Sequence, residues 1–528
     1  LYLNRFQGFA ISQSIRLAPI TLIFGPNAAG KSSILRALRL LDQSFEGDGR
    51  LKFNGPKASL GGFPSLVHRG GSESDFEVGF VSDLSNTARR LQAEALTRMN
   101  SVNYVGRQRT KIQPESMSNT SAEISLTVDD VAGGFPKLAL FKHQFKFQDE
   151  TPTQEFRDAR IEGVFARHEV GGGYVYRLES IVFDEGADFW IKNILLPIAE
   201  RNDPDGANRS AVPDTSSPEM GNWEIFLKEF DYSHERYGLL PSSTDMGAFR
   251  KSLQAETLEA GYARDFASAY FPYVNRLLSP PRTSNVGPLR EISQAFSSGE
   301  VAHELEADGS NILDYLMGLS ERDLSAISLR LEMLTDGRFG VKLLSTRDDE
   351  SNIGMEGYEV AGGEFTRLFL VDHHNKTLVS PINAGAGLSQ VLPVVVGLTE
   401  PEGDRNKRRV VATFKDNRRA RIALIEQPEL HLHPAMQAEL ASLFLSTLET
   451  PAAQSHNLER VGQIVVETHS ESLLLRVQKL VRTGLLRAQD VSLIFVDQWA
   501  LGGNLAQEIR LSEEGNFRDI WPKSFSDV

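Results

Sequence analysis

The chain has 528 residues, enough for two or three domains. Its hydrophobic fraction of 41% is ordinary for a globular protein, and its net charge of −14 argues against a protein that coats DNA without specificity. Cysteine is absent, which excludes disulfides and thiolate chemistry. We see no signal peptide and no apolar stretch that could span a bilayer, so we expect no membrane association and a cytoplasmic location.

The first motif in the chain is a phosphate loop. Residues 25–32 read GPNAAGKS, which is the complete pattern GxxxxGK[ST]. The apolar run 20–24 before it predicts a buried strand, and the apolar residues after it share one face of a helix. Backbone amides of such a loop point at phosphate oxygens, Lys31 is expected to reach the β- and γ-phosphates, and Ser32 to hold Mg²⁺. The predicted nucleotide-binding residues here are Asn27, Ala28, Ala29, Gly30, Lys31, Ser32 and Ser33.

Alternating apolar and polar residues then predict half-exposed antiparallel strands. The runs are 76–81, 122–128, 138–147, 161–168 and 174–183. From about residue 186 the pattern becomes helical, and strands resume after Gly340 at 341–344, 366–371 and 377–382. His373 and His374 lie between the last two, where an exposed hairpin turn is favoured over a metal site because no cysteine or carboxylate cluster stands nearby.

These changes of pattern predict three parts of the chain. Residues 1–185 would form an N-terminal ATPase lobe with the phosphate loop and the antiparallel strands. Residues 186–335 would form a mostly helical insertion. Residues 336–528, in which strands and helices alternate, would form a C-terminal ATPase lobe.

A glycine-containing segment, NAGAGLSQ, covers residues 383–390. Gly385 and Gly387 would let the backbone approach a phosphate, and Ser389 would begin a helix over 391–398 whose positive end faces an anion. The alternative is an ordinary helix entry that contains glycine.

Two further apolar runs each end in charged or polar residues. The run 421–425 leads into Glu426-Gln427-Pro428-Glu429, where a carboxylate at a strand end would join Ser32 at Mg²⁺. The run 463–466 leads into Glu467-Thr468-His469, where His469 would sense a γ-phosphate or orient a water. The order of the motifs makes them mutually reinforcing.

This order of motifs resembles that of ABC-type ATPases. The segments GPNAAGKSS, NAGAGLSQVLPV, IEQPELHLHP and ETHSES are similar to the SMC-like branch, which includes the ATPase domain of OLD-family nucleases and stand-alone bacterial defence ATPases. The resemblance covers residues 1–90 and about 285–528. It implies an α/β fold: an ABC-type P-loop ATPase head, with a mixed sheet and an antiparallel meander, that carries a largely helical insertion.

The resemblance also implies ATP and Mg²⁺ as cofactors and a homodimer or higher oligomer that sandwiches nucleotide. The phosphate loop of one copy would face Gly385, Gly387 and Ser389 of the other. Residues 430–434 would be the D-loop at the dimer seam, which we favour over a metal site formed by His431 and His433.

The chain departs from the family pattern at two places. Gln427 stands where the water-activating glutamate is usual, and an amide cannot accept a proton at neutral pH, so hydrolysis should be slow or use Glu429 or His469. The predicted catalytic residues are therefore Glu426, Gln427, Glu429 and His469, and the predicted metal ligands are Ser32 and Glu426. No Q-loop glutamine lies between Gln43 and Gln92, where His68 is either a substitute or an ordinary surface histidine.

The resemblance implies an ATPase subunit that acts as sensor or scaffold of a bacterial anti-phage complex and controls a separate nuclease or toxin. Two alternatives stay open: a DNA-repair or recombination ATPase that binds DNA through the closed dimer, and a nucleotide-bound scaffold with negligible turnover. A basic run is either a surface for DNA or RNA or a solvated loop; its residues include Arg405, Lys407, Arg408 and Arg409.

Overall fold

The structure is a computed structural model, and its contacts divide the chain into two compact units. The first comprises Leu1–Ser12 and Leu40–Pro280, and the second comprises Gln13–Arg39 and Pro281–Val528. The structure describes residues 1–45, 50–55, 57–68, 75–83, 117–130, 135–148, 155–171, 173–191, 227–228, 270–271, 274, 278, 280–290, 292, 296–297, 301–302, 304–345, 366–399, 421–448, 461–498 and 502–521.

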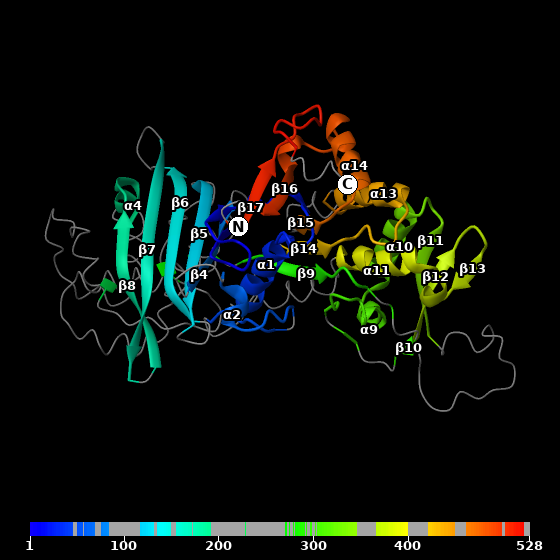
Figure 1. The fold of residues 1–528 in the computed structure, drawn as a ribbon, viewed down its shortest axis with the longest axis horizontal. Coiled ribbons are helices and arrows are strands. Elements are labelled where there is room, and N and C mark those ends of the chain that lie inside the picture. Colours follow the sequence, from blue (N-terminus) through cyan, green and yellow to red (C-terminus); the bar gives the residue numbers. More distant parts are fainter. Residues whose placement is uncertain are drawn as a thin grey trace, which may run out of the picture. The chain divides into compact units, whose positions relative to one another are not determined.

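The first unit is built on a sheet of antiparallel strands (Figure 1). From β1 onward, the order along the sheet is β1-β4-β5-β6-β7-β8, so neighbours after β1 are also successive along the chain. This is the meander that the alternating sequence predicts. The strands are β1 (Tyr2–Asn4), β4 (Asp75–Asp83), β5 (Met117–Asp129), β6 (Pro136–Gln148), β7 (Phe156–Val170) and β8 (Gly173–Phe183), with short helices α2 (Phe63–Leu66) and α4 (Glu185–Trp190).

Aromatic side chains form much of the core of this first unit. Phe141 stacks on Phe165 at 5.8 Å between ring centroids, and Phe271 packs edge-on against both rings. His143 is fully buried, and its Nδ1 lies 3.2 Å from the Tyr270 hydroxyl. Burial lowers the pKa of His143 to about 3, so this histidine is neutral at physiological pH.

The second unit contains a six-stranded sheet in the order β17-β16-β3-β15-β14-β9. All neighbours are parallel except β17, which is antiparallel to β16. Every residue of β3 is buried, as expected for a central strand with a continuous apolar sequence. The strands are β17 (Asn504–Ile509), β16 (Val491–Gln498), β3 (Ile20–Phe24), β15 (Val461–Glu467), β14 (Arg421–Glu426) and β9 (Arg282–Val286).

The remaining elements of the second unit include helices and a smaller antiparallel sheet, in which β11 and β13 both pair with β12. The helices are α9 (Ile312–Met317), α10 (Glu321–Leu334), α11 (Ala386–Gly397), α13 (Pro434–Leu448) and α14 (Glu471–Arg482), with 3₁₀ turns η4 (Pro381–Asn383) and η6 (Ala488–Asp490). The small sheet comprises β10 (Phe296–Ser297), β11 (Phe339–Ser345), β12 (Thr366–Asp372) and β13 (Thr377–Val379).

Two elements lie where the chain passes between the units. β2 (Gln13–Ser14) begins the first segment of the second unit. The helix α1 (Lys31–Phe45) belongs to the second unit as far as Arg39 and to the first unit from Leu40.

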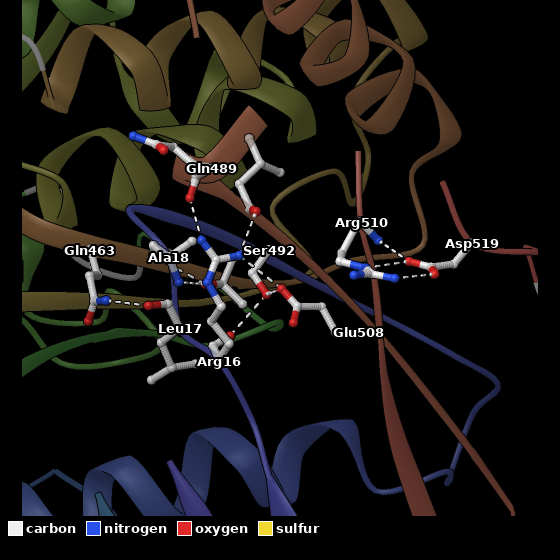
Figure 2. Close-up of polar contacts among 11 residues, drawn as sticks. Arg16, Leu17, Ala18, Gln463, Gln489, Ser492, Glu508, Arg510 and Asp519 are labelled. Carbon is white, nitrogen blue, oxygen red and sulfur yellow. Dashed lines mark hydrogen bonds and ion pairs between the residues drawn. The ribbon is translucent and has the colours of Figure 1, made fainter. Parts of the chain in front are cut away.

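The segment before β3 is fixed by polar contacts to three other strands of its sheet (Figure 2). Arg16 forms an ion pair with Glu508 of β17 at 2.9 Å, and its carbonyl accepts a hydrogen bond from Ser492 of β16. Gln463 of β15 donates to the carbonyl of Leu17 at 2.8 Å. These contacts set the point at which β3 enters the sheet and therefore where the phosphate loop leaves it.

The fold prediction, an α/β protein with a mixed sheet and an antiparallel meander, is confirmed. The two compact units do not coincide with the parts predicted from the sequence, whose boundaries are at 185 and 335. The phosphate loop belongs to the same unit as residues 281–528, and the antiparallel strands belong to the other unit. Within the expected helical insertion 186–335, β9 is a strand of the six-stranded sheet. No helix of the described residues is both long enough and apolar enough to cross a membrane.

Candidate nucleotide-binding site

The phosphate loop connects β3 to α1 and depends on two glycines. Gly25 has φ +144° and Gly30 has φ +93°, backbone conformations that side chains rarely adopt. A Cβ on Gly25 would lie 2.0 Å from the carbonyl oxygen of Val496, and one on Gly30 would lie 2.1 Å from Nδ2 of Asn504. The loop therefore packs against β16 and β17 in a way that admits only glycine at these two positions.

Lys31 is the first residue of α1 and is 4% exposed. Its Nζ donates to the loop carbonyls of Gly25 at 3.0 Å and Pro26 at 2.9 Å, so the ammonium lies inside the curve of the loop. Burial lowers the pKa of Lys31, while nearby Glu467 opposes this shift. Asn27 and Ala28 are exposed, and Ala29 and Ser33 are buried.

A glutamate outside the predicted site set lies beside the phosphate-loop serine. Ser32 donates its hydroxyl to Oε2 of Glu467 at 2.8 Å, and Oε1 of Glu467 lies 3.9 Å from Nζ of Lys31. Glu467 is the last residue of β15, the strand next to β3 in the sheet. Burial raises the pKa of Glu467, and the hydrogen bond from Ser32 opposes that shift.

Glu426, predicted to be a metal ligand, has a basic partner. Its Oε1 accepts from Nη2 of Arg39 at 2.6 Å, and Nε of Arg39 donates to Oδ1 of Asn285 at 2.8 Å. The Arg39 and Glu426 side chains are only 11% and 13% exposed. Glu426 thus lies at the same end of the sheet as Glu467, but it is engaged with α1 two helical turns beyond Ser32.

Gln427 follows β14 in a left-handed backbone conformation, with φ +45°. The backbone NH of Gln427 donates to the backbone carbonyl of Glu467 at 2.7 Å. The backbone carbonyl of Gln427 accepts from Nη2 of Arg290 at 2.9 Å. Nη1 of Arg290 also donates to the carbonyl of Glu426 at 3.0 Å. Burial lowers the pKa of Arg290 to about 10, while the charges of Glu429 and Glu426 oppose the shift.

Glu429 and His469, the two candidates for the general base, are in direct contact. Oε1 of Glu429 accepts from the backbone amide of His469 at 2.7 Å, and Oε2 accepts from the Thr468 hydroxyl at 2.9 Å. Burial raises the pKa of Glu429, against the effect of these hydrogen bonds. Burial, and then the charge of Lys31, lower the pKa of His469, which favours a neutral imidazole.

The glycine segment begins α11 earlier than the sequence suggested. The helix starts at Ala386, not near Ser389, because Gly385 at φ +87° forms its N-cap. Among the residues that the structure describes, a Cβ on Gly385 would meet no atom within 4 Å, so there is open space beside this glycine. The Ser389 hydroxyl donates to the carbonyl of Pro381 at 2.8 Å, and Gly387 lies close to the carbonyl of His431.

Gln390, on the first turns of α11, joins this segment to the end of β14. Its side-chain amide donates to the backbone carbonyl of Arg290, the residue whose guanidinium holds Glu426 and Gln427. Sequence reasoning missed Arg290 and Arg39, because isolated arginines usually lie on the surface.

His68, His373 and His431, all among the described residues, lie in turns or next to backbone groups. Nδ1 of His68 lies 2.7 Å from the carbonyl of Gln7, and His431 adopts φ +61° in the turn after Glu429. His373 lies in the hairpin turn between β12 and β13, as expected. The described part of the chain contains no group of three or more His, Asp or Glu side chains that could hold a metal ion. The basic run 405–409 lies outside the described residues.

The residues of the loop fit a magnesium nucleotide. Mg²⁺ prefers oxygen ligands, commonly one or two carboxylates together with substrate phosphates, and the Ser32 hydroxyl and a Glu467 carboxylate oxygen lie 2.8 Å apart. Lys31 and Ser32 also begin α1, where backbone NH groups lack partners within the helix and favour an anion.

Comparisons with known proteins support the two parts of this site separately. Residues 20–119, which include the phosphate loop, match the family model "AAA domain, putative AbiEii toxin, Type IV TA system". Residues 346–474, which include the glycine segment and the ends of β14 and β15, match "AAA ATPase domain". Two separate segments of the chain, one with the phosphate loop and one with the ends of β14 and β15, are therefore similar to AAA-family ATPase domains. No curated protein sequence matches the chain.

Two solved structures are similar over most of their length. One is "SMC head domain from Thermotoga maritima", with TM-score 0.31 and 9% identity over 97% of this chain and 98% of that chain. The other is "Structure of the recombination mediator protein RecF-ATPrS in RecFOR pathway", with TM-score 0.25 and 10% identity over 94% of each chain. At these TM-scores the similarity decides nothing about function.

Proposed function

We propose that this protein binds and hydrolyses ATP with Mg²⁺. The observation that carries the proposal is the arrangement at one end of the sheet, where Lys31 and Ser32 lie beside Glu467 and the neighbouring strand β14 leads into Gln427. The similarity of residues 20–119 and 346–474, which contain these side chains, to AAA-family ATPase domains supports the same activity.

The side chains divide the chemistry among them. Lys31 supplies a positive charge for the terminal phosphates, and Mg²⁺ would neutralise charge that develops on them. Gln427 can orient a water but cannot take its proton, so turnover is slow unless Glu429 or His469 acts as base. The hydrogen bonds that Glu429 accepts from Thr468 and His469 compete with such a role.

We further propose that two copies close over nucleotide, with the phosphate loop of one facing Gly385, Gly387 and Ser389 of the other. The open space around Gly385 at the start of α11 supports this. Slow hydrolysis would keep such a dimer closed for long periods. A nucleotide-bound scaffold is therefore the second candidate, and Gln427 is the observation that favours it.

In the cell, we propose that this ATPase controls a separate toxin or nuclease in bacterial defence. The match of residues 20–119 to a family described by a putative toxin of a type IV toxin–antitoxin system supports that context. Co-purification of the tagged chain from its native host tests it: an effector nuclease or toxin should be retained with Mg-ATP, and recovery of no such protein would contradict it.

Two assays test the ATPase proposal. The affinity for a fluorescent ATP analogue is measured in the presence of Mg²⁺, and the release of phosphate from ATP measures hydrolysis. Lys31→Ala removes the buried ammonium of the loop and is expected to weaken binding at least tenfold, because it deletes the charge that faces the phosphates. Lys479→Ala, at an exposed lysine of α14, is the matched control and should bind as the unmodified chain does. Equal affinity in the two variants would contradict the assignment of the phosphate loop.

A further inference from the structure

We propose that Glu467, and not Glu426, is the acidic residue that completes the magnesium site with Ser32. This inference rests on the proposed function, since it concerns the metal of the same nucleotide site. It assigns a metal-binding role to a residue at the end of β15 and leaves Glu426 with a structural role at the end of β14.

Strand order places Glu467 nearer to the phosphate loop. β15 lies directly beside β3, and Glu467 is in register with Ile23, one residue before the end of β3. β14 is one strand farther away, and Glu426 is in register with Glu467. Because neighbouring strands lie about 4.8 Å apart, the backbone of Glu426 is roughly 10 Å from β3, twice the separation of Glu467.

The side-chain contacts agree with the strand order. Oε2 of Glu467 accepts the Ser32 hydroxyl at 2.8 Å, and Oε1 lies 3.9 Å from Nζ of Lys31. The Lys31 and Glu467 side chains are 4% and 8% exposed, so the carboxylate is held inside the site. The hydroxyl uses its hydrogen in this bond, which leaves its lone pairs for a cation.

Glu426 is already committed to a different partner. Arg39 binds its Oε1 at 2.6 Å and is itself oriented by Asn285 at 2.8 Å. Ser32 and Arg39 are seven residues apart, on one face of α1 and about 10 Å apart along its axis. One face of α1 thus contacts both carboxylates: the Ser32 hydroxyl binds Glu467, and the Arg39 guanidinium binds Glu426. A cation at Oε1 of Glu426 would have to displace Arg39.

A titration with Mn²⁺ tests the assignment without relying on turnover. Electron paramagnetic resonance measures the bound Mn²⁺ in the presence of a non-hydrolysable ATP analogue. Glu467→Gln keeps the size of the side chain and removes its charge, and should weaken Mn²⁺ binding tenfold or more. Glu426→Gln should change Mn²⁺ affinity less than twofold. Glu439→Gln, on α13 and paired with Arg476, is the matched control and should change nothing.

A second variant guards against misfolding. Glu467→Asp keeps the carboxylate and should bind Mn²⁺ more tightly than Glu467→Gln. Circular dichroism verifies that these two variants and Glu426→Gln, which leaves Arg39 without its anionic partner, are folded under the assay conditions. The proposal is overturned if Glu426→Gln loses as much affinity as Glu467→Gln, or if neither loses any. If the unmodified chain binds no Mn²⁺ nucleotide at all, the proposed function itself fails, which is a different result.

Discussion

The ion pair between Arg39 and Glu426 gives a prediction about stability. Both side chains are about nine-tenths buried, and the guanidinium also donates to Asn285. Arg39→Met fills much of the same volume but leaves the Glu426 carboxylate buried without its cation. Removing one partner of a buried pair costs about 3–5 kcal/mol, and we take the lower end, about 3 kcal/mol, because some exposure remains.

A loss of this size should lower the melting temperature of a unit as large as this one by about 6–12 °C. Differential scanning calorimetry would measure it. Arg487→Met breaks an exposed ion pair with Asp490 and should leave the melting temperature unchanged. The double variant Arg39→Met with Glu426→Gln removes both charges and should recover part of the loss. If Arg39→Met has the same melting temperature as the unmodified chain, or if the double variant melts no higher than Arg39→Met, the pair does not contribute the stability that we assign to it.

Two further predictions concern hydrolysis and acid. Gln427→Glu supplies a carboxylate where the amide cannot accept a proton and should raise steady-state phosphate release at least tenfold without changing ATP affinity; an unchanged rate would place the base at Glu429 or His469. At Asp372, burial alone would raise the pKa, but hydrogen bonds from Asn375 and Arg338 and the charge of Arg338 lower it to about 2. Its stabilising effect is therefore present above its ordinary pKa of about 4 and is lost as pH falls through 2. In urea titrations, Asp372→Asn should be less stable than the unmodified chain at pH 7, with the difference vanishing near pH 2; a constant difference would contradict this reasoning.

Local sequence patterns were sufficient for the elements that frame the site. The phosphate-loop motif predicted a strand and a helix, and β3 and α1 are found there. Alternating residues predicted β4 to β8, since a sheet with one buried face imposes a period of two. The apolar runs before Glu426 and Glu467 became the central strands β14 and β15.

The contacts of the carboxylates could not be predicted in the same way. Whether Glu426 or Glu467 lies beside Ser32 depends on the order of parallel strands, and periodicity within a strand carries no information about its neighbours. β9 was missed because its sequence, RTSNV, has little apolar character. One feature of the sequence could have indicated the position of Arg39. It follows Ser32 by seven residues, and residues seven apart lie on the same face of a helix, so Arg39 is expected to face the sheet as Ser32 does.

The position of β3 has a consequence for biosynthesis. Its two neighbours, β15 and β16, follow it along the chain by more than 430 residues, since β3 ends at Phe24 and β15 begins at Val461. At a translation rate of about 5–20 residues per second, roughly 20–90 s pass between the emergence of this apolar strand and that of its first partner. Throughout that interval Ile20–Phe24 is a nascent segment with its pairing edges open. We therefore expect newly made chains to expose this apolar strand until β15 and β16 emerge.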